Sequence, residues 1–454
     1  MSGGVGAIRG RAFGRRRAKK KTKAKTKARP KAASHPIEYQ LLLTATMCLL
    51  AFGVVMVYSA SSSASLLGAN GDGAYYLKRT LMFGAIGLFA LHFLARYGLG
   101  AVRKLTPLIL LGAVFLLLAT KAIGAEVNGA QRWIVLGPVQ IQASEIAKVS
   151  LMLYGAHILA DRPQMTRDLR SLRPFLLIVG AVVALIVVEP DLGTAMVTAF
   201  AVTALLIAAG VQMRHLAMLG GALAFIVFVA VLMEPYRMQR LTSFVNPSAD
   251  ASGAGFQGMQ AWIALGSGGI FGNGIGESVQ KAFYLPEAHT DMIAAVIGEE
   301  LGLFGISILC GLYMMFGYAG FRTAQRAKDR YGRLLAAALT AMIMVQATIN
   351  LFAVLGLAPL TGVTLPFVSY GNSSLIVTLA AVGLLLNIAN GGTAAAGVAP
   401  SRGSRGAFEV IDGGRTGPRR PRHQSGGSRA TSGDRRRRDS GARSAGAGRR
   451  RRAR

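Results

Sequence analysis

The sequence has very little cysteine and few acidic side chains. Only two cysteines occur in 454 residues, and both Cys48 and Cys310 lie inside apolar runs. This excludes a disulfide framework and a cysteine-based metal cluster. Acidic residues number 20 against 51 lysines and arginines, which gives a formal net charge of +31. The meaning of that charge depends on where the basic residues lie.

The excess of basic residues is concentrated at the two ends of the chain. Residues 1–36 carry 13 lysines and arginines and no acid, and residues 391–454 carry 17 with four acids. Both ends are poor in large apolar residues, so we expect disordered tails around a folded region, 37–390. No aromatic residues alternate with the charges, so we expect contact with anionic lipid and no nucleic-acid binding. Docking of an acidic cytoplasmic partner is the alternative.

Long apolar runs fill the region between the tails. The chain is 52% hydrophobic with a mean hydropathy of +0.43, and runs of about 20 apolar residues indicate membrane-spanning helices. The sequence therefore predicts an all-α polytopic membrane protein with ten transmembrane helices. We place them at about 40–59, 80–95, 105–120, 142–160, 174–188, 192–209, 215–233, 292–320, 334–356 and 373–390.

The distribution of basic residues predicts the orientation of these helices. With both ends in the cytoplasm, 43 lysines and arginines lie on the cytoplasmic side and 7 on the other, apart from Lys148 inside the fourth segment. This asymmetry agrees with the positive-inside rule. It places the loops 121–141, 189–191, 234–290 and 357–372 outside, with a large extracytoplasmic loop between helices 7 and 8. We therefore expect the chemistry to face outward.

The stretch GAEVNGAQRWIVLGPVQIQASEIAK carries one polar cluster. Glu145 and Lys148 are three residues apart and share a helix face, with Gln142 just before them. They form either an intrahelical ion pair or a site in which Glu145 orients Lys148 toward an anionic headgroup. Arg132, beside Trp133, either holds a phosphate or anchors the chain at the membrane interface.

The turn VVEPDLGTA follows the fifth apolar segment. Pro190 ends one helix and Asp191 is placed to cap the next, which explains an aspartate here without a site. Capping does not explain Glu189, a glutamate at the end of an apolar run.

In the loop 234–290, GSGGIFGNGIGES lacks the strand and helix of a dinucleotide fingerprint. We interpret it as irregular backbone that lines a cavity.

The richest cluster lies in YLPEAHTDMIAAVIGEELG, residues 284–302. It carries the ionisable side chains Glu287, His289, Asp291, Glu299 and Glu300. Such residues at membrane depth mark a functional site by default. On a helix Glu299 lies about 80° from Asp291 and Glu300 lies on the opposite side, so we expect Glu299 to share a cavity with Asp291. Taken alone, Asp291 has an alternative explanation without a functional site, because the helix dipole stabilises a carboxylate at the N-terminus of a helix. The neighbouring His and carboxylate side chains also permit a divalent cation.

The last polar loop is GLAPLTGVTLPFVSYGNSSL. Its prolines and glycines interrupt a helix pair, and Ser369, Asn372 and Ser373 offer neutral hydrogen bonds. The loop either lines a site for sugar or phosphate or is a re-entrant capping segment.

These motifs resemble the SEDS family (shape, elongation, division and sporulation) of bacterial cell-wall polymerases over about residues 40–390. The blocks that carry the resemblance are NGAQRWIVLGPVQIQASEIAK, EPDLGTA, YLPEAHTDMIAAVIGEELG, QATINLFAVLGLAPLTG and VTLPFVSYGNSSL. The run Thr364-Leu365-Pro366 resembles the division branch. Two positions depart from the family pattern: Ala143 stands where proline is usual, and Asn372 where a second glycine is usual.

The resemblance implies a peptidoglycan glycosyltransferase that polymerises lipid II on the outer face of the bacterial cytoplasmic membrane. It implies that Asp291 is the catalytic base, that Glu145 and Lys148 belong to a family motif, and that Mg or Mn is a possible cofactor. The implied partners are lipid II, a class B penicillin-binding transpeptidase and other divisome proteins. Our substrate-binding candidates are Arg132, Gln142, Glu145, Lys148, Asp191, Glu287, His289, Glu299, Ser369, Asn372 and Ser373.

The sequence is also compatible with three other functions. A lipid II flippase would also use many helices, broken turns and buried glutamates. The outward gathering of the polar loops favours the enzyme, because a carrier should show matched sites on both faces. An elongation-type polymerase would share the chemistry but not the cellular role, and a non-catalytic scaffold would tolerate Asp291→Asn.

Overall fold

The structure, a computed structural model, describes residues 35–392 apart from 68–70, 128–129, 138, 233–234, 247–252, 254 and 283. The tails predicted at 1–36 and 391–454 lie almost wholly outside the described residues. The described part coincides with the predicted membrane domain, 37–390.

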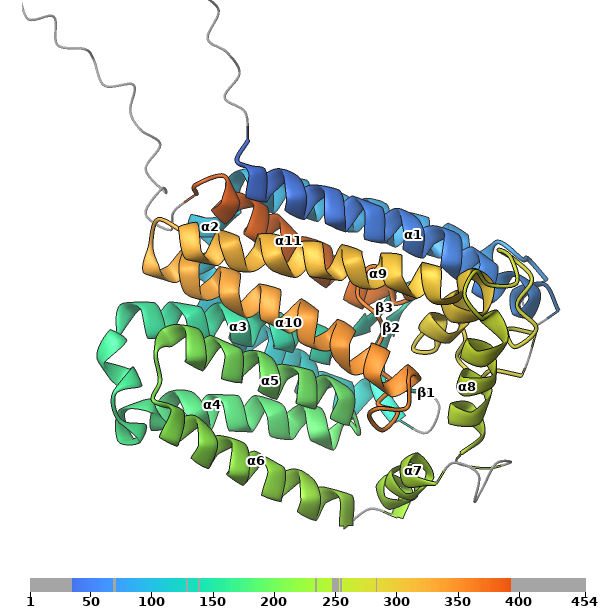
Figure 1. The fold of residues 1–454 in the computed structure, drawn as a ribbon. Helices are drawn as coiled ribbons and strands as arrows, with labels where there is room; N and C mark the ends of the chain where they lie inside the picture. Colours follow the sequence, from blue (N-terminus) through green and yellow to red (C-terminus); the bar gives the residue numbers. More distant parts are fainter. Residues whose placement is uncertain are drawn as a thin grey trace, which may run out of the picture. The chain divides into compact units, whose positions relative to one another are not determined.

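Helices dominate the described residues, and one small sheet interrupts them (Figure 1). The α-helices are α1 (Ile37–Leu67), α2 (Tyr75–Ile123), α3 (Ala143–Asp161), α4 (Leu169–Val188), α5 (Leu192–Ala209), α6 (Met213–Leu232), α7 (Pro235–Val245), α8 (Phe256–Gly268), α9 (Ile293–Arg326), α10 (Arg330–Val354) and α11 (Asn372–Ala389). The other elements are β1 (Ala125–Val127), β2 (Ala130–Leu136), β3 (Val139–Gln142) and the 3-10 helix η1 (Pro163–Thr166).

Each apolar segment predicted from the sequence falls on a helix. Among the described residues, seven helices are long and apolar enough to cross a membrane: α1, α2, α4, α5, α9, α10 and α11. Helix α2 contains two of the predicted segments, 80–95 and 105–120, and α3 and α6 contain two more. The predicted multi-pass membrane protein is therefore confirmed, whereas the number of ten crossings stays a prediction.

Helix α2 reverses its direction although it is assigned as one element of 49 residues. A straight helix of that length would extend about 74 Å. The two ends of α2 lie near each other: Tyr76 in its first turn packs on the loop before α9, and its last residue leads into β1. The middle of α2 lies at the opposite end of the helices, because Arg103 binds Asp161 at the C-terminal end of α3, away from β3. Asn387 on α11 donates to the carbonyls of residues 94 and 95, which places the reversal near them.

The loop 121–141, predicted only as polar, folds into an antiparallel sheet in the order β1-β2-β3. In its register Trp133 pairs with Gln142 and Ile134 with Ile141, and Gly137, with φ of 61°, lies in the turn between the last two strands. The all-α prediction holds for the membrane helices and missed this sheet. Because β3 runs directly into α3, the sheet and the start of α3 lie at one end of the helices, which we call the sheet end (Figure 1).

Helix α9 is broken at the depth where the sequence predicted an unbroken span. Gly302 has φ of 63° and ψ of −160°, which no helix contains. The carbonyls of Glu299 and Glu300 accept from the amides of Asn273 and Gly274 instead of from helical partners. The segment 269–274 thus fills the break, because unpaired backbone groups are too costly to leave at membrane depth. The predicted loop 234–290 also contains α7 and α8.

Candidate functional site

Asp291 lies in a turn that ends directly before α9. Its carboxylate is half-buried, and its Oδ1 lies 3.3 Å from the Thr290 hydroxyl. The same hydroxyl donates to Glu287 Oε2 at 2.8 Å, so the two carboxylates are neighbours. Glu287 is exposed and has φ of 55°, a costly conformation for a residue other than glycine. The structure therefore brings together two carboxylates of the polar cluster 284–302.

The backbone at Asp291 is fixed by α10 and by the loop after it. Asn350 Nδ2 donates to the carbonyls of Asp291 and Val363, each at 2.7 Å. Gly362 faces the carboxylate, since a Cβ built on it would lie 3.9 Å from Asp291 Oδ2. Its φ of 68° also favours glycine. The predicted polar loop before α11 therefore forms the wall opposite Asp291.

His289 lies in an aromatic cluster beside this turn. Its ring centroid is 4.3 Å from that of Tyr76 and 5.6 Å from that of Tyr370, and its carbonyl accepts from the Tyr370 amide at 2.9 Å. Burial lowers the pKa of His289, and the nearby Glu287 only partly opposes this. The imidazole is therefore neutral at pH 7 and its ring mainly joins α2, the Asp291 turn and the last loop.

Glu145 and Lys148 form the intrahelical ion pair that the sequence left as one alternative. Lys148 is only 1% exposed, and its Nζ lies 3.0 and 2.9 Å from the two oxygens of Glu145. It also donates to Gln346 Oε1 at 2.6 Å, while Gln346 Nε2 donates to the Thr364 carbonyl at 3.0 Å. The pair is thus tied to the same loop that faces Asp291.

Asp191 joins three elements at the sheet end. It caps α5 by accepting from the Thr194 amide at 3.1 Å, as the sequence predicted. Its other oxygen accepts from Gln142 Nε2 at 3.0 Å and from the Ser144 hydroxyl at 2.8 Å. The predicted residues Gln142 and Asp191 are therefore in direct contact, and the cap also fixes β3 and the start of α3.

The same turn holds Arg132. Its Nε donates to the Glu189 carbonyl at 3.2 Å and its Nη2 to the Pro190 carbonyl at 2.5 Å. The Glu189 side chain is only 1% exposed, and neither of its oxygens has a hydrogen-bond partner among the described residues. Burial, followed by the negative charge of Asp191, raises the pKa of Glu189 to about 8. Glu189 is thus a carboxylic acid at neutral pH.

The serines and the asparagine of the last loop have mainly structural contacts. Ser373 donates to the Gln140 carbonyl at 2.6 Å and accepts from the Gln142 amide at 3.1 Å, which joins α11 to β3. Ser369 accepts from the Leu365 amide. Asn372 Nδ2 lies 3.2 Å from the Tyr370 hydroxyl, and its buried Oδ1 has no hydrogen-bond partner in the described part of the chain.

The Glu299 carboxylate contacts the loop 278–280, whereas that of Asp291 contacts Thr290. Glu299 accepts from the Ser278 hydroxyl at 2.5 Å and from the amides of Val279 and Gln280. It therefore holds the loop before the Asp291 turn. The helical geometry behind the expected cavity shared by Glu299 and Asp291 does not apply to Asp291, because this residue precedes the helix, whose N-cap is Met292.

Sequence reasoning missed Gln346 and Asn350, which lie four residues apart on α10 and hold the loop before α11. Polar side chains inside an apolar segment were the available signal.

The described residues contain no group of three or more His, Cys, Asp or Glu side chains placed to hold a metal ion. The site offers at most the neighbouring carboxylates of Glu287 and Asp291.

Comparison with known proteins agrees with this arrangement. A family model for FtsW, RodA and SpoVE, described as "Cell cycle protein", matches residues 39–393. A protein of Geobacter sp. (strain M18), named probable peptidoglycan glycosyltransferase FtsW, is 38% identical over 351 residues, which are 77% of this chain and 95% of that protein. Stage V sporulation protein E of Bacillus subtilis (strain 168) is 39% identical over 353 residues, which are 77% and 96%.

Solved structures share the fold. The rod shape determining protein RodA of Thermus thermophilus aligns with a TM-score of 0.58 at 29% identity, over 79% of this chain and 98% of that one. A chain from a peptidoglycan synthase complex, in which polymerization and crosslinking are coordinated, aligns with a TM-score of 0.64 at 30% identity, over 77% and 96%. Since the family model spans nearly all the described helices and the relatives align over most of their length, this chain belongs to the FtsW/RodA/SpoVE family, the SEDS family that its motifs resemble.

Proposed function

We propose that this protein is a peptidoglycan glycosyltransferase that polymerises lipid II on the outer face of the cytoplasmic membrane during septal wall synthesis. The observation that carries the proposal is the half-buried Asp291 carboxylate, set before a broken helix and facing the backbone of Gly362. Such a carboxylate combines a fixed position with access for a substrate hydroxyl. Relatives at 38–41% identity are named FtsW and peptidoglycan glycosyltransferase, which supports both the reaction and the division role.

In this mechanism Asp291 is the general base. It takes the proton from the 4-hydroxyl of the acceptor GlcNAc, and the oxygen attacks C1 of the donor MurNAc with inversion. The bond from C1 to the pyrophosphate oxygen breaks as the new glycosidic bond forms. Asn350 and Gly362 position Asp291: the first fixes its backbone, and the second leaves space at its carboxylate.

The leaving group is undecaprenyl pyrophosphate, which needs charge neutralisation more than a strong acid. Arg132 uses two of its five N–H groups on backbone carbonyls, so its guanidinium is oriented with donors remaining for phosphate. Lys148 adds a positive charge, although Glu145 and Gln346 hold its ammonium in the structure. Gln142, Asp191 and Ser373 would support β3, which pairs with the strand β2 that carries Arg132.

In the part of the chain that the structure describes, no group of three or more His, Cys, Asp or Glu side chains is placed to hold a resident metal ion. Glu287 and Asp291 are two neighbouring carboxylates, which suits a magnesium or manganese ion that arrives with the pyrophosphate and keeps several waters.

The proposed orientation places both tails in the cytoplasm and Asp291 outside. His35 Nδ1 lies 3.1 Å from Asn390 Oδ1, so the chain enters and leaves the described helices side by side. Both residues lie at the ends of α1 and α11 away from the sheet end (Figure 1). We further propose a class B penicillin-binding transpeptidase and other divisome proteins as partners, and anionic lipid at the basic tails.

The test is polymerisation of lipid II by purified protein, with and without the transpeptidase and with chelator. Asp291→Asn should bind lipid II but lose at least about 10²-fold in glycan synthesis. The control is Glu277→Gln, which removes an exposed carboxylate from the preceding loop and should keep full activity. Polymer made at the wild-type rate by Asp291→Asn would refute the assignment.

The same preparations separate the enzyme from a flippase and from a scaffold. A flippase moves labelled lipid II between the leaflets of liposomes without changing it, whereas the enzyme makes a glycan ladder in detergent. A scaffold would support division in cells with Asp291→Asn. An elongation role would appear as rescue of a strain that lacks its elongation polymerase.

A further inference from the structure

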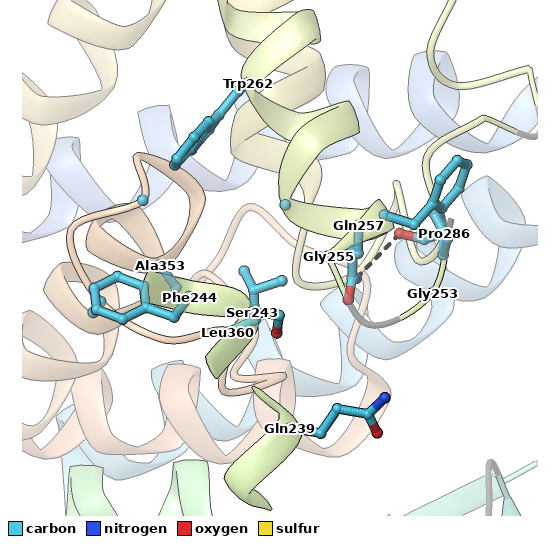
Figure 2. Close-up of a pocket in the computed structure, with 14 residues that line it drawn as sticks. Gln239, Ser243, Phe244, Gly253, Gly255, Gln257, Trp262, Pro286, Ala353 and Leu360 are labelled. Atoms are coloured by element: carbon cyan, nitrogen blue, oxygen red, sulfur yellow. Dashed lines mark hydrogen bonds between the residues drawn. The ribbon is translucent and has the colours of Figure 1, made fainter. Parts of the chain in front are cut away.

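A cavity of about 230 Å³ lies between α7, α8 and the segment after α10 (Figure 2). Its wall includes Pro286, five residues before Asp291, and Leu360, two residues before Gly362. Because Gly362 faces the Asp291 carboxylate, both segments that form the Asp291 site continue into this wall. A substrate bound at Asp291 therefore has a neighbouring compartment.

The described residues that line this cavity have uncharged side chains. Figure 2 shows Gln239 and Gln257 on different sides of the space, with Trp262 at a third position. Within the described part of the chain, no lysine, arginine, histidine, aspartate or glutamate lines it. A pyrophosphate would need cationic donors, and a lipid chain would be poorly matched by two amides and the Ser243 hydroxyl. The lining suits a neutral, polar ligand.

Trp262 is fixed and partly open. A Cβ on Gly356 would lie 2.4 Å from the indole Cζ2, so the backbone of Gly356 packs directly against the ring. The side chain is nevertheless 40% exposed. A rigid aromatic face with amide groups beyond it matches a pyranose, whose C–H face packs on the ring while its hydroxyls bond to amides.

The size of the cavity favours a single ring. An apolar cavity of about 150 Å³ is enough for benzene, so about 230 Å³ accommodates one substituted six-membered ring of a saccharide, whose next ring would lie outside the cavity. We propose that this cavity is a saccharide subsite that holds one pyranose of the growing glycan beyond the Asp291 centre. The inference rests on the proposed polymerase function and extends it to the chain that is being lengthened.

The first test uses the two tryptophans of the chain, Trp133 and Trp262. In a Trp133→Phe variant the intrinsic fluorescence reports only on Trp262. Titration with the GlcNAc–MurNAc disaccharide, without peptide or pyrophosphate, should shift that fluorescence, whereas inorganic pyrophosphate should not. The parallel Trp262→Phe variant should show no shift. The proposal is overturned if the disaccharide has no effect up to about 10 mM, ten times the ~1 mM dissociation constant expected of a weak sugar site, or if pyrophosphate alone gives the shift.

The second test measures polymerisation. Trp262→Ala and Gln257→Lys should raise the KM for lipid II about tenfold and shorten the glycan strands, with kcat changed less than about twofold. The control is Ile263→Ala, the next residue on α8, which is exposed and does not line the cavity. Wild-type strand length in Trp262→Ala, or a lower KM in Gln257→Lys, would contradict the proposal. If wild-type protein made no polymer, the proposed function would fail while the fluorescence result would still decide whether sugar binds.

Discussion

The Lys281 ammonium lies 2.8 Å from the Glu300 carboxylate, and the two side chains are 5% and 0% exposed. The Ser59 hydroxyl lies 2.7 Å from both oxygens of Glu300, and Lys281 also donates to the Gly276 carbonyl at 2.6 Å. The pair therefore joins α1, the loop before the Asp291 turn and the broken part of α9.

Removing one partner of this pair should destabilise the protein more than removing both. Lys281→Met leaves the Glu300 charge buried without its cation, and we expect a loss of about 3 kcal/mol. The double variant Lys281→Met with Glu300→Gln should recover most of it, because no uncompensated charge remains. Thermal unfolding in detergent measures both. A double variant as unstable as the single one would show that the pair does not act as a unit.

The break in α9 should require glycine at position 302. A Cβ on Gly302 would lie 2.5 Å from the Gly272 amide nitrogen, and the φ of 63° is strained for other residues. We expect Gly302→Ala to destabilise the protein by about 2 kcal/mol or more. The matched control is Gly311→Ala on the same helix, where a Cβ meets nothing within 4 Å. It should be neutral or slightly stabilising, so equal losses in the two variants would contradict the structure.

The buried acid Glu189 should make stability depend on pH. Its pKa is raised from 4.5 to about 8 by burial and by Asp191. Between these two values the folded protein holds a proton that the unfolded chain has lost, so stability falls as pH rises through this window. Glu189→Gln has no proton to lose and should be more stable than wild type above pH 8, by about 2 kcal/mol, with little difference near about pH 4.

The measurement is the unfolding temperature of both proteins across that pH range. Glu277→Gln, which changes an exposed carboxylate, is the control and should keep the wild-type slope. Identical pH slopes in wild type and Glu189→Gln would show that Glu189 is ionised in the folded protein.

The contribution of the Glu145–Lys148 ion pair to stability can be distinguished from its contribution to glycan synthesis. Lys148→Met should reduce both stability and polymerisation, because Glu145 is left buried and unpaired. Adding Glu145→Gln should restore stability, yet glycan synthesis should stay about 10²-fold low if the ammonium neutralises the pyrophosphate. Full recovery of synthesis in the double variant would assign the pair to structure alone.

Several features of the site could be predicted from the sequence because they are local. The cap of α5 by Asp191 and the pairing of Glu145 with Lys148 depend on residues three apart on one helix. The neighbourhood of Glu287 and Asp291 follows from a short turn. By contrast, the contacts of the Glu299 carboxylate with the loop 278–280 could not be predicted, because they join residues about 20 positions apart in the sequence.

The membrane character, the position of the helices and the motifs of the family follow from the sequence alone, because the length of an apolar run and the spacing of a motif are properties of a short stretch of chain. The folding back of α2, the filling of the break in α9 by 269–274 and the position of Gly362 opposite Asp291 became visible in the three-dimensional structure. These features depend on backbone groups that must find partners far along the chain once water is excluded. Which distant segment supplies each partner is set by the packing of the whole bundle.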